Sequence, residues 1–325
     1  MNAPTTLTVR VLRKAVEAEG ICSFELAAVD GAPLPAFSAG SHVEVQLPGG
    51  LTRQYSLCND PAESHRYLIG VLRDPASRGG SQAMHDAVRE GDTLQISAPK
   101  NHFALAHGAE RHLLLAGGIG VTPILCMAER LACTGADFEM HYCTRSRART
   151  AFQRRIAAAA FAARVQFHLD DGEPAQKLDI AALLGTPRAG EHVYVCGPKG
   201  FMDAVLGSAR SAGWPEAQLH FEFFGAGPAD VAATPAMSAF EVQLASSGRV
   251  IAVAADQSVV QALAAAGVVV PTSCEQGVCG TCLTRVLAGE CEHKDLYLTP
   301  EEQTAQDQFL PCCSRAKTPR LVLDL

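Results

Sequence analysis

The sequence of 325 residues has no excess of positive charge and no long hydrophobic run. Its 27 Lys and Arg residues are outnumbered by 34 Asp and Glu residues, which gives a formal net charge of -7. A protein that binds nucleic acid through the phosphates needs the opposite balance, so we expect no nucleic-acid partner. No stretch reaches the roughly 18 apolar residues of a membrane-spanning helix, so we expect no membrane span.

The first residues contain neither a basic nor an apolar block, so we expect no signal peptide. The chain has 12 cysteines, a number that would suggest disulfides in a secreted protein. Without a signal peptide, and with several cysteines in the metal-binding pattern described next, we expect reduced thiols and a cytoplasmic location. Hydrophobic residues make up 48% and charged residues 19% of the chain, as in an ordinary globular protein of two or three domains.

Three cysteines near the C-terminal end lie in a C-x4-C-x2-C pattern, at Cys274, Cys279 and Cys282. With a fourth cysteine farther along the chain, this spacing is typical of a plant-type [2Fe-2S] cluster. Gly277 and Gly280 permit a tight loop and leave peptide N–H groups free to face the sulfides. Zinc is the weaker alternative, because structural zinc sites usually have two tight arms and this chain has one. Packing thiols alone would not explain the spacing.

The fourth ligand must come from Cys291, Cys312 or Cys313. In an extended chain neighbouring side chains point in opposite directions, so only one of Cys312 and Cys313 should reach the iron. The residues by themselves do not decide between these two.

From about Leu7 to Phe103, short apolar alternations are separated by Gly, Pro and Asp. This pattern predicts a small antiparallel β-barrel. The clearest strands are expected at 8–12, 22–26, 42–47, 66–72 and 93–96.

Two polar clusters in this region predict a ligand with a phosphate group and a planar ring. In the first, Arg53 and Tyr55 share one face of a strand and Ser56 points to the other. The second, 73–81, ends in two glycines and a serine at the start of a predicted helix, where N–H groups bind an anion. Each cluster alone is weak, since an Arg-x-Tyr pair is more often an ordinary strand feature.

From His112 onward, strands alternate with helices, which predicts a parallel sheet covered on both faces. The first strand enters a glycine turn at 117–120 and then a helix with Pro123 near its start. This is the context of a dinucleotide-binding fold, although the spacing is not G-x-G-x-x-G. The later strands are expected at 138–143, 165–169, 192–196 and 221–224.

The segment after this region has small residues and prolines without periodicity, and we interpret it as a linker. Beyond it, a hairpin at 240–253 and a helix at 258–266 precede the cysteine loop.

Together these parts resemble the phthalate dioxygenase reductase family, a group that includes the vanillate O-demethylase reductases. The resemblance covers nearly the whole chain and rests on the motifs at 53–60, 78–81, 116–123, 195–198, 274–282 and 314–325. It implies a multidomain α/β and β protein. The parts would be an FMN-binding β-barrel at 1–105, an NAD-binding α/β domain at 106–225, a linker at 226–238 and a ferredoxin β-grasp domain at 239–325.

The resemblance also implies roles for single residues. Arg53 and the 78–81 segment would hold the FMN phosphate, Tyr55 would line the isoalloxazine, and Ser56 would lie near its N5. The full set implied for FMN is Arg53, Tyr55, Ser56, Leu57, Arg73, Arg78, Gly79, Gly80 and Ser81. The set implied for the nicotinamide nucleotide is Gly118, Thr122, Thr144, Arg145, Cys196, Gly197 and Pro198. Phe224 would cover the flavin until nicotinamide displaces it, which makes Ser56 and Phe224 the candidate catalytic residues.

The resemblance implies Cys312 as the fourth cluster ligand. In this family, one residue separates the ligand from a Ser-Arg-Ala segment, which is 314–316 here. Cys291 and Cys313 are then packing thiols.

The function implied is electron transfer from NADH through FMN and the [2Fe-2S] cluster to a Rieske-type terminal oxygenase for an aromatic acid or ether. A flavin is needed because nicotinamide gives electrons in pairs and an iron–sulfur cluster takes one. The alternatives are a stand-alone flavin or ferric reductase and a redox-sensing binding protein. We expect a monomer, with an acidic docking face around Glu275, Glu290 and Glu292.

NADPH is the alternative nucleotide. NADH users in this family often have an acid after the second strand, where this chain has Arg145, Ser146 and Arg147. Such residues accept a 2′-phosphate, although a solvated loop explains them equally well.

Overall fold

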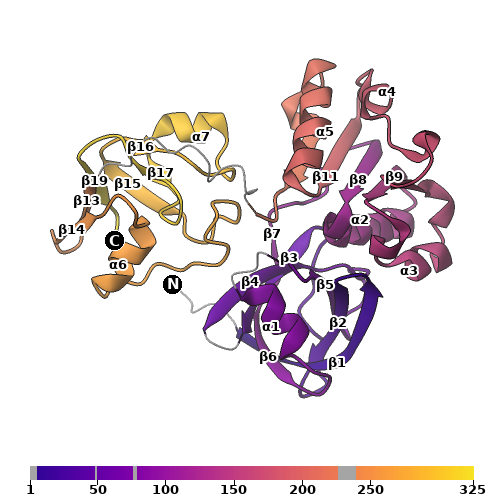
Figure 1. The fold of residues 1–325 in the computed structure, drawn as a ribbon, viewed down its shortest axis with the longest axis horizontal. Coiled ribbons are helices and arrows are strands. Elements are labelled where there is room, and N and C mark those ends of the chain that lie inside the picture. The colour runs from indigo at the N-terminus through magenta and orange to yellow at the C-terminus, as the bar shows by residue number, and fades with distance from the viewer. Residues whose placement is uncertain (1–5, 48–49, 76–78, 226–238) are drawn as a thin grey trace. The chain divides into compact units, whose positions relative to one another are not determined.

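The computed structural model describes residues 6–47, 50–75, 79–225 and 239–325. The chain divides after Phe224 into two compact units (Figure 1). The expected linker at 226–238 and Arg78 of the expected phosphate site lie outside the described residues.

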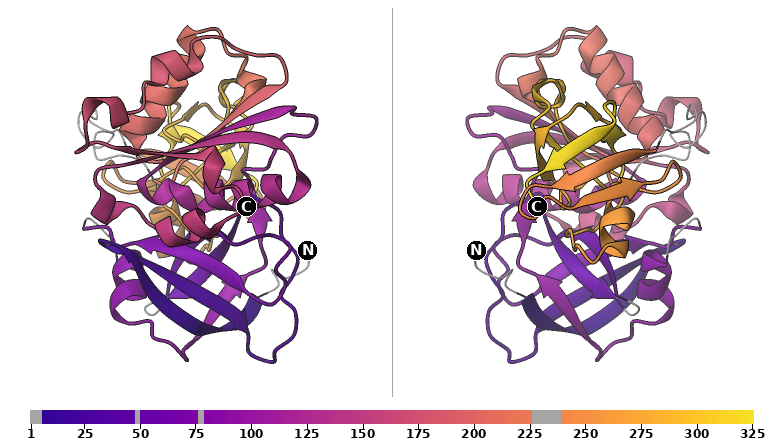
Figure 2. Two further views of the ribbon diagram at one scale, coloured as in Figure 1. Left: turned by 90° about the vertical axis from the view of Figure 1, so that its right-hand side faces the viewer. Right: turned by 90° about the vertical axis from the view of Figure 1, so that its left-hand side faces the viewer.

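The first unit begins with a seven-stranded antiparallel sheet in the order β4-β3-β6-β1-β2-β5, with β7 paired to β3. Its strands are β1 (Thr6–Ala18), β2 (Ile21–Ala28), β3 (Ser41–Leu47), β4 (Leu51–Ser56), β5 (Tyr67–Leu72), β6 (Thr93–Ser97) and β7 (Lys100–Asn101), and α1 (Gly80–Asp86) follows β5. A bridge between Leu57 and Ile69 joins the two ends of this order. The sheet therefore closes into the predicted barrel, whose twisted strands are indigo and purple in Figure 2.

The alternation in the sequence fills the barrel. Along β3, Val43, Val45 and Leu47 are buried, while Gln46 between them is exposed. Phe24 of β2 is fully buried among the same side chains. Each fully buried side chain of this size stabilises the fold by about 1.5–3 kcal/mol.

The same unit continues with five parallel strands in the order β10-β9-β8-β11-β12. Its elements are β8 (Arg111–Gly117), η1 (Gly118–Gly120), α2 (Val121–Thr134), β9 (Asp137–Thr144), α3 (Gln153–Ala158), β10 (Val165–Leu169), α4 (Ile180–Leu184), β11 (Glu191–Cys196), α5 (Lys199–Ser211) and β12 (Leu219–Glu222). The chain order reverses between β8 and β11, the point at which open α/β sheets bind their ligands. The last strand ends at Glu222, so Phe224 lies beyond it and not within it as predicted.

Helices cover both faces of this sheet, as the alternating pattern predicts (Figure 1). Leu114 and Tyr142 pack with α2 and α3, whereas Leu113 and Val195 pack with α4 and α5. Among the described residues, no helix combines the length and apolar character needed to cross a bilayer.

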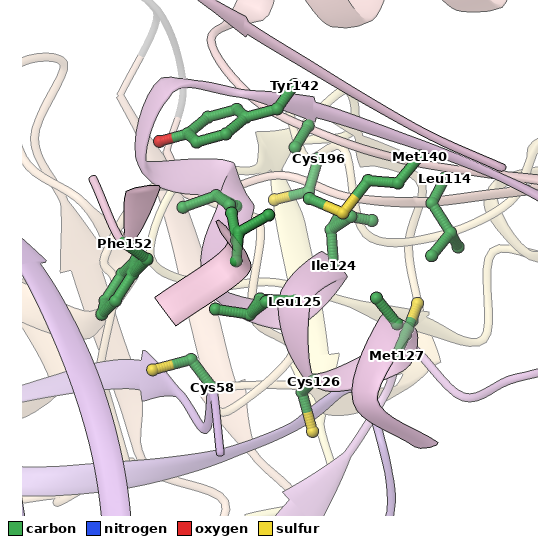
Figure 3. Packing of buried hydrophobic residues seen from close by; sticks show 14 of the residues in the cluster. Cys58, Leu114, Ile124, Leu125, Cys126, Met127, Met140, Tyr142, Phe152 and Cys196 are labelled. Carbon is green, nitrogen blue, oxygen red and sulfur yellow. The ribbon is translucent and has the colours of Figure 1, made fainter. Parts of the chain in front are cut away.

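One hydrophobic core joins the barrel to the parallel sheet. It contains Cys58 and Phe103 from the barrel segment together with Ile124 and Leu125 of α2 and Tyr142 of β9. Figure 3 shows the two α2 side chains between Tyr142 and Cys58. The residues on either side of position 105 therefore belong to one compact unit.

The second unit contains a mixed sheet in the order β14-β13-β19-β15-β17 and a small sheet of β16 and β18, the predicted β-grasp type of fold. Its elements are β13 (Phe240–Leu244), β14 (Val250–Val253), α6 (Val259–Ala265), β15 (Thr284–Ala288), β16 (Cys291–Glu292), α7 (Pro300–Ala305), β17 (Gln308–Phe309), β18 (Arg315–Ala316) and β19 (Arg320–Leu323). α6 begins where predicted because Ser258 and Gln261 form a reciprocal capping box. Val259 and Leu263 of this helix are fully buried.

Two glycines of the barrel provide a matched test of its packing. Both have positive φ, but a Cβ on Gly40 would lie 1.8 Å from Phe103 O, whereas a Cβ on Gly31 would meet nothing within 4 Å. We expect Gly40→Ala to lower the free energy of unfolding by about 2 kcal/mol more than Gly31→Ala, because only the former displaces backbone. Thermal and urea unfolding of the two variants measures the difference, and equal losses would contradict the packing described.

Candidate functional site

The two polar clusters of the barrel meet at the start of α1. A Cβ on Gly80 would lie 2.6 Å from Arg53 Cγ and 2.7 Å from its Nε, so the arginine packs directly on this glycine. Gly79 caps the helix with a φ of 92°, in the left-handed region that favours glycine. The hydroxyl of Ser81 accepts a hydrogen bond from Asp74 N–H at 3.1 Å. Arg53, Gly79, Gly80 and Ser81 are therefore assembled in one place.

Lys14 of β1 positions α1, and sequence reasoning missed it. Its ammonium donates hydrogen bonds to the carbonyl oxygens of Met84 at 3.3 Å and Val88 at 2.9 Å, at the C-terminal end of the helix. A cation there complements the helix dipole. Arg73, expected to bind the cofactor, is exposed and forms an ion pair with Asp86 of α1 at 2.8 Å.

Tyr55 and Ser56 have opposite orientations on β4, as predicted. In the register of β3 and β4, Tyr55 is opposite Val43 of the barrel core and Ser56 is opposite His42. Burial raises the pKa of the Tyr55 phenol, and the charge of Arg53 lowers it by a smaller amount. Tyr55 therefore stays a neutral aromatic ring. Leu57, which follows Ser56, is fully buried.

Glu222 joins the barrel to the parallel sheet at this point. Ser56 Oγ donates a hydrogen bond to Glu222 Oε2 at 3.3 Å, and the strand register puts Glu222 beside Cys196. Burial raises the pKa of the Glu222 carboxyl to about 7, and the Ser56 hydrogen bond opposes that shift. Burial, and then the nearby Glu222, raise the pKa of the Cys196 thiol well above its usual value. A carboxyl that titrates near neutral pH can hold or move a proton at the Ser56 hydroxyl.

The glycine turn after β8 contacts the end of β11, where the strand order reverses. A Cβ on Gly120 would lie 2.1 Å from Cys196 O, and a Cβ on Gly197 would lie 3.0 Å from Gly117 Cα. Gly118 has a φ of 53°, and a Cβ there would meet nothing within 4 Å, so the backbone faces open space.

Two residues expected to contact the nucleotide, Thr122 and Thr144, use their hydroxyl groups for hydrogen bonds within the protein. Thr122 is 1% exposed, and its hydroxyl donates to Ile119 O at 3.0 Å. Thr144 is also buried, and its hydroxyl forms a hydrogen bond with that of Thr150 at 2.7 Å. Pro198, in contrast, lies at the N-terminal cap of α5, next to the turn.

The arginines after β9 differ in their partners. Arg149 forms an ion pair with Glu19 of the barrel at 2.8 Å. Arg145 and Arg147 are exposed, and within the described part of the chain neither guanidinium has an ion-pair partner.

Phe224, the residue expected to cover the flavin, is 42% exposed.

The cysteine loop of the second unit brings four thiols together. Cys274 contacts Cys279 and Cys312, and Cys312 also contacts Cys282. Gln276 N–H donates to Cys274 Sγ at 3.3 Å, and the positive φ values of Gly277 and Gly280 turn the loop as predicted. Contact with the neighbouring thiols lowers the pKa of the Cys274 thiol.

The extended conformation expected at Cys312 and Cys313 is wrong. These residues lie in a turn and not in an extended strand, because the N–H groups of Cys313 and Ser314 both donate to Leu310 O, at 3.2 Å and 2.9 Å. Cys312 contacts the loop thiols of Cys274 and Cys282. The Cys313 sulfur lies 3.7 Å from Leu310 O. Cys291 is fully buried on β16.

Comparison with known proteins identifies the same parts. Residues 242–317 match the model of the 2Fe-2S iron-sulfur cluster binding domain, and residues 96–219 match that of the dimethylamine monooxygenase subunit DmmA-like N-terminal domain. The chain is 59% identical over 310 residues to vanillate O-demethylase oxidoreductase from Pseudomonas putida, covering 95% of this chain and 96% of the relative. It is 40% identical over 321 residues to phthalate dioxygenase reductase from Burkholderia cepacia, covering 98% and 97%.

A solved structure aligns with nearly the whole of this chain. It is described as phthalate dioxygenase reductase, a modular structure for electron transfer from pyridine nucleotides to [2Fe-2S]. It aligns with a TM-score of 0.76 at 40% identity and covers 98% of each chain. The fold and the comparisons define an oxidoreductase of the flavin- and iron–sulfur-dependent class. The chain belongs to the phthalate dioxygenase reductase family, the reductase components of oxygenase systems, which confirms the resemblance seen in the sequence.

The raised pKa of Glu222 makes stability depend on pH in a defined direction. The folded protein holds this proton more tightly than the unfolded chain, whose carboxyl has the usual pKa of 4.5. The resulting stabilisation is complete below pH 4.5, decreases as pH rises, and is lost above about 7. We expect the melting temperature of flavin-free Glu222→Gln, relative to that of the unmodified protein, to increase between pH 5 and about 8.

A second substitution checks the cause of this shift. Ser56→Ala removes the hydrogen bond that favours the ionised carboxyl, so it should move the midpoint of the pH dependence upward. A temperature difference that stays constant with pH in Glu222→Gln would mean that the carboxyl is not protonated in the folded protein.

Proposed function

We propose that this chain passes electrons from NADH through FMN and a [2Fe-2S] cluster to a Rieske-type terminal oxygenase. The observation that supports it most directly is the convergence of Cys274, Cys279, Cys282 and Cys312 in the second unit. Because a relative with 59% identity is named vanillate O-demethylase oxidoreductase, we propose that the partner demethylates an aromatic methyl ether such as vanillate.

The cysteine loop fits a cluster in both ligands and shape. Four thiolates are the ligand set of a [2Fe-2S] cluster, which accepts one electron at a time. Gly280 leaves room for Tyr297, since a Cβ there would lie 2.3 Å from the ring. The loop is therefore held in its turn by packing as well as by its own dihedral angles.

The barrel fits FMN through residues from separate strands. We assign the phosphate to Arg53 and to the 79–81 segment, on which this arginine packs. Tyr55 would lie against the isoalloxazine and the Ser56 hydroxyl near its N5, with Glu222 behind that hydroxyl at 3.3 Å. Bound FMN exchanges electrons with NADH in pairs and with the cluster singly.

We assign the nicotinamide nucleotide to the switch point of the parallel sheet. Gly118 exposes backbone there, and Cys196, Gly197 and Pro198 form the opposite side. NADH is the proposed donor on family grounds. Arg145 and Arg147, both exposed after β9, support some acceptance of the 2′-phosphate of NADPH.

An acidic docking face for the oxygenase remains a proposal. Glu275 and Glu290 are exposed in the second unit, while Glu292 lies 3.5 Å from the ammonium of Lys294. We also propose a cytoplasmic location, because the 12 cysteines, all within the described residues, form no disulfide there and the cluster needs reduced ligands.

Anaerobic titration of the purified protein with NADH, and separately with NADPH, tests the electron path. We expect bleaching of the flavin absorbance followed by the EPR signal of a reduced [2Fe-2S] cluster. Reduction of the flavin without a cluster signal would contradict the proposal and leave a simple flavin reductase. The nucleotide that reduces the flavin at the lower concentration identifies the preferred donor.

The Cys279→Ser variant separates the rival functions. We expect it to lose NADH-dependent reduction of cytochrome c by more than about tenfold, because only the cluster path is broken, while reduction of a small dye persists. Undiminished cytochrome c reduction would favour a stand-alone reductase. Absence of turnover in the unmodified protein would favour a redox sensor.

A further inference from the structure

The segment Asp295–Tyr297, between β16 and α7 (Figure 1), packs against both glycines of the cysteine loop. A Cβ on Gly277 would lie 3.0 Å from Asp295 Cα, and a Cβ on Gly280 would lie 2.3 Å from the Tyr297 ring. Between these contacts, Leu296 N–H donates a hydrogen bond to Gly277 O at 3.0 Å. The segment thus supports the loop along the stretch that separates its cysteines.

Within this segment, Asp295 has a carboxylate with no exposed surface. Oδ1 accepts a hydrogen bond from Ser314 Oγ at 3.1 Å, and Oδ2 accepts one from Leu298 N–H at 2.9 Å. The ring of His293, itself 6% exposed, approaches Oδ1 with its Nδ1 at 3.4 Å. A buried carboxylate is costly unless hydrogen bonds satisfy it, so these partners fix its position.

Ser314 connects Asp295 to the turn that contains Cys312. Ser314 is 1% exposed, and its N–H donates to Leu310 O at 2.9 Å, which closes the turn. Its hydroxyl accepts a hydrogen bond from Lys294 N–H at 3.2 Å while donating to Asp295. The Cys312 turn is therefore attached to the same short segment that supports the cysteine loop.

We propose that Asp295 is a positioning residue that holds the two separate parts of the cluster site, the 274–282 loop and the Cys312 turn, in register. The inference rests on the proposed binding of a [2Fe-2S] cluster by these cysteines. Three ligands come from the loop and the fourth from a turn about thirty residues later, and a rigid cluster tolerates little change in their spacing. Asp295 joins the loop by its backbone and the turn by its carboxylate.

Three substitutions test this role in the full-length protein containing flavin and cluster. Asp295→Ala removes the hydrogen bonds of the carboxylate to Ser314 and Leu298. Ser314→Ala removes the hydroxyl that joins the Cys312 turn to Asp295 and to Lys294 N–H. Asp295→Asn keeps an oxygen that accepts from Leu298 N–H, and its amide N–H can donate to the Ser314 hydroxyl in place of the bond that this hydroxyl donates to Asp295. Asp256→Ala is the control, because this aspartate is exposed in the same unit.

The measurement is the rate at which a chelator removes iron, together with the EPR spectrum of the reduced cluster. We expect at least about tenfold faster iron loss and broadened EPR lines in Asp295→Ala and Ser314→Ala, because each variant loses two hydrogen bonds between the segment and the turn or helix beside it. Asp295→Asn should stay within about twofold of the unmodified protein, since it can still hydrogen-bond both Leu298 N–H and the Ser314 hydroxyl, with the direction reversed at Ser314. FMN content and NADH-dependent flavin reduction should be unchanged in every variant.

Iron-release rates in Asp295→Ala and Ser314→Ala equal to that of the unmodified protein would overturn the proposal. Equal lability of Asp295→Asn and Asp295→Ala would also overturn it, because the hydrogen bonds would then be irrelevant. If Asp295→Ala does not fold, the comparison of Ser314→Ala with Asp256→Ala decides. An unmodified protein that lacks a [2Fe-2S] spectrum would instead reject the proposed function, which keeps the two failures distinct.

Discussion

The packing of α2 against both the parallel sheet and the barrel is the constraint on which the first unit depends. Gly70 of β5 approaches Thr122 so closely that a Cβ there would lie 2.8 Å from the threonine methyl group. This shared core sets the separation of the two halves, and the hydrogen bond between Ser56 and Glu222 forms across it. Well-packed interiors deform little, so the residues that we propose for flavin and for nucleotide are held at a constant spacing.

Glycine has the same physical role in all three parts of the site. Gly80 makes room for Arg53, Gly120 for the carbonyl group of Cys196, and Gly280 for Tyr297. In each case the missing Cβ permits contact between segments that are remote in sequence. The glycines therefore serve the assembly of the site as much as the turning of the chain.

The barrel, the parallel sheet and the cysteine loop could be predicted because each has a local pattern of fixed period or spacing. Lys14, Glu222 and Asp295 could not, because each is a single polar residue whose partners lie far away in the sequence. In the sequence, a single glutamate in an aromatic strand is expected to face solvent, and only the neighbouring barrel makes Glu222 a half-buried partner of Ser56. Only the family resemblance singles out Cys312, and the alternation rule does not apply to a turn.

The division of the chain after Phe224 follows from the two kinds of transfer that the protein is proposed to perform. Hydride transfer requires reacting atoms in near contact and correctly oriented, so flavin and nicotinamide sites need one rigid framework. The shared core between barrel and sheet provides it. Single-electron transfer forms no bond between donor and acceptor, so the cluster does not need a place in that core. A ferredoxin unit with its own core can therefore accept electrons from one partner and deliver them to another, provided that its four cysteines keep their spacing.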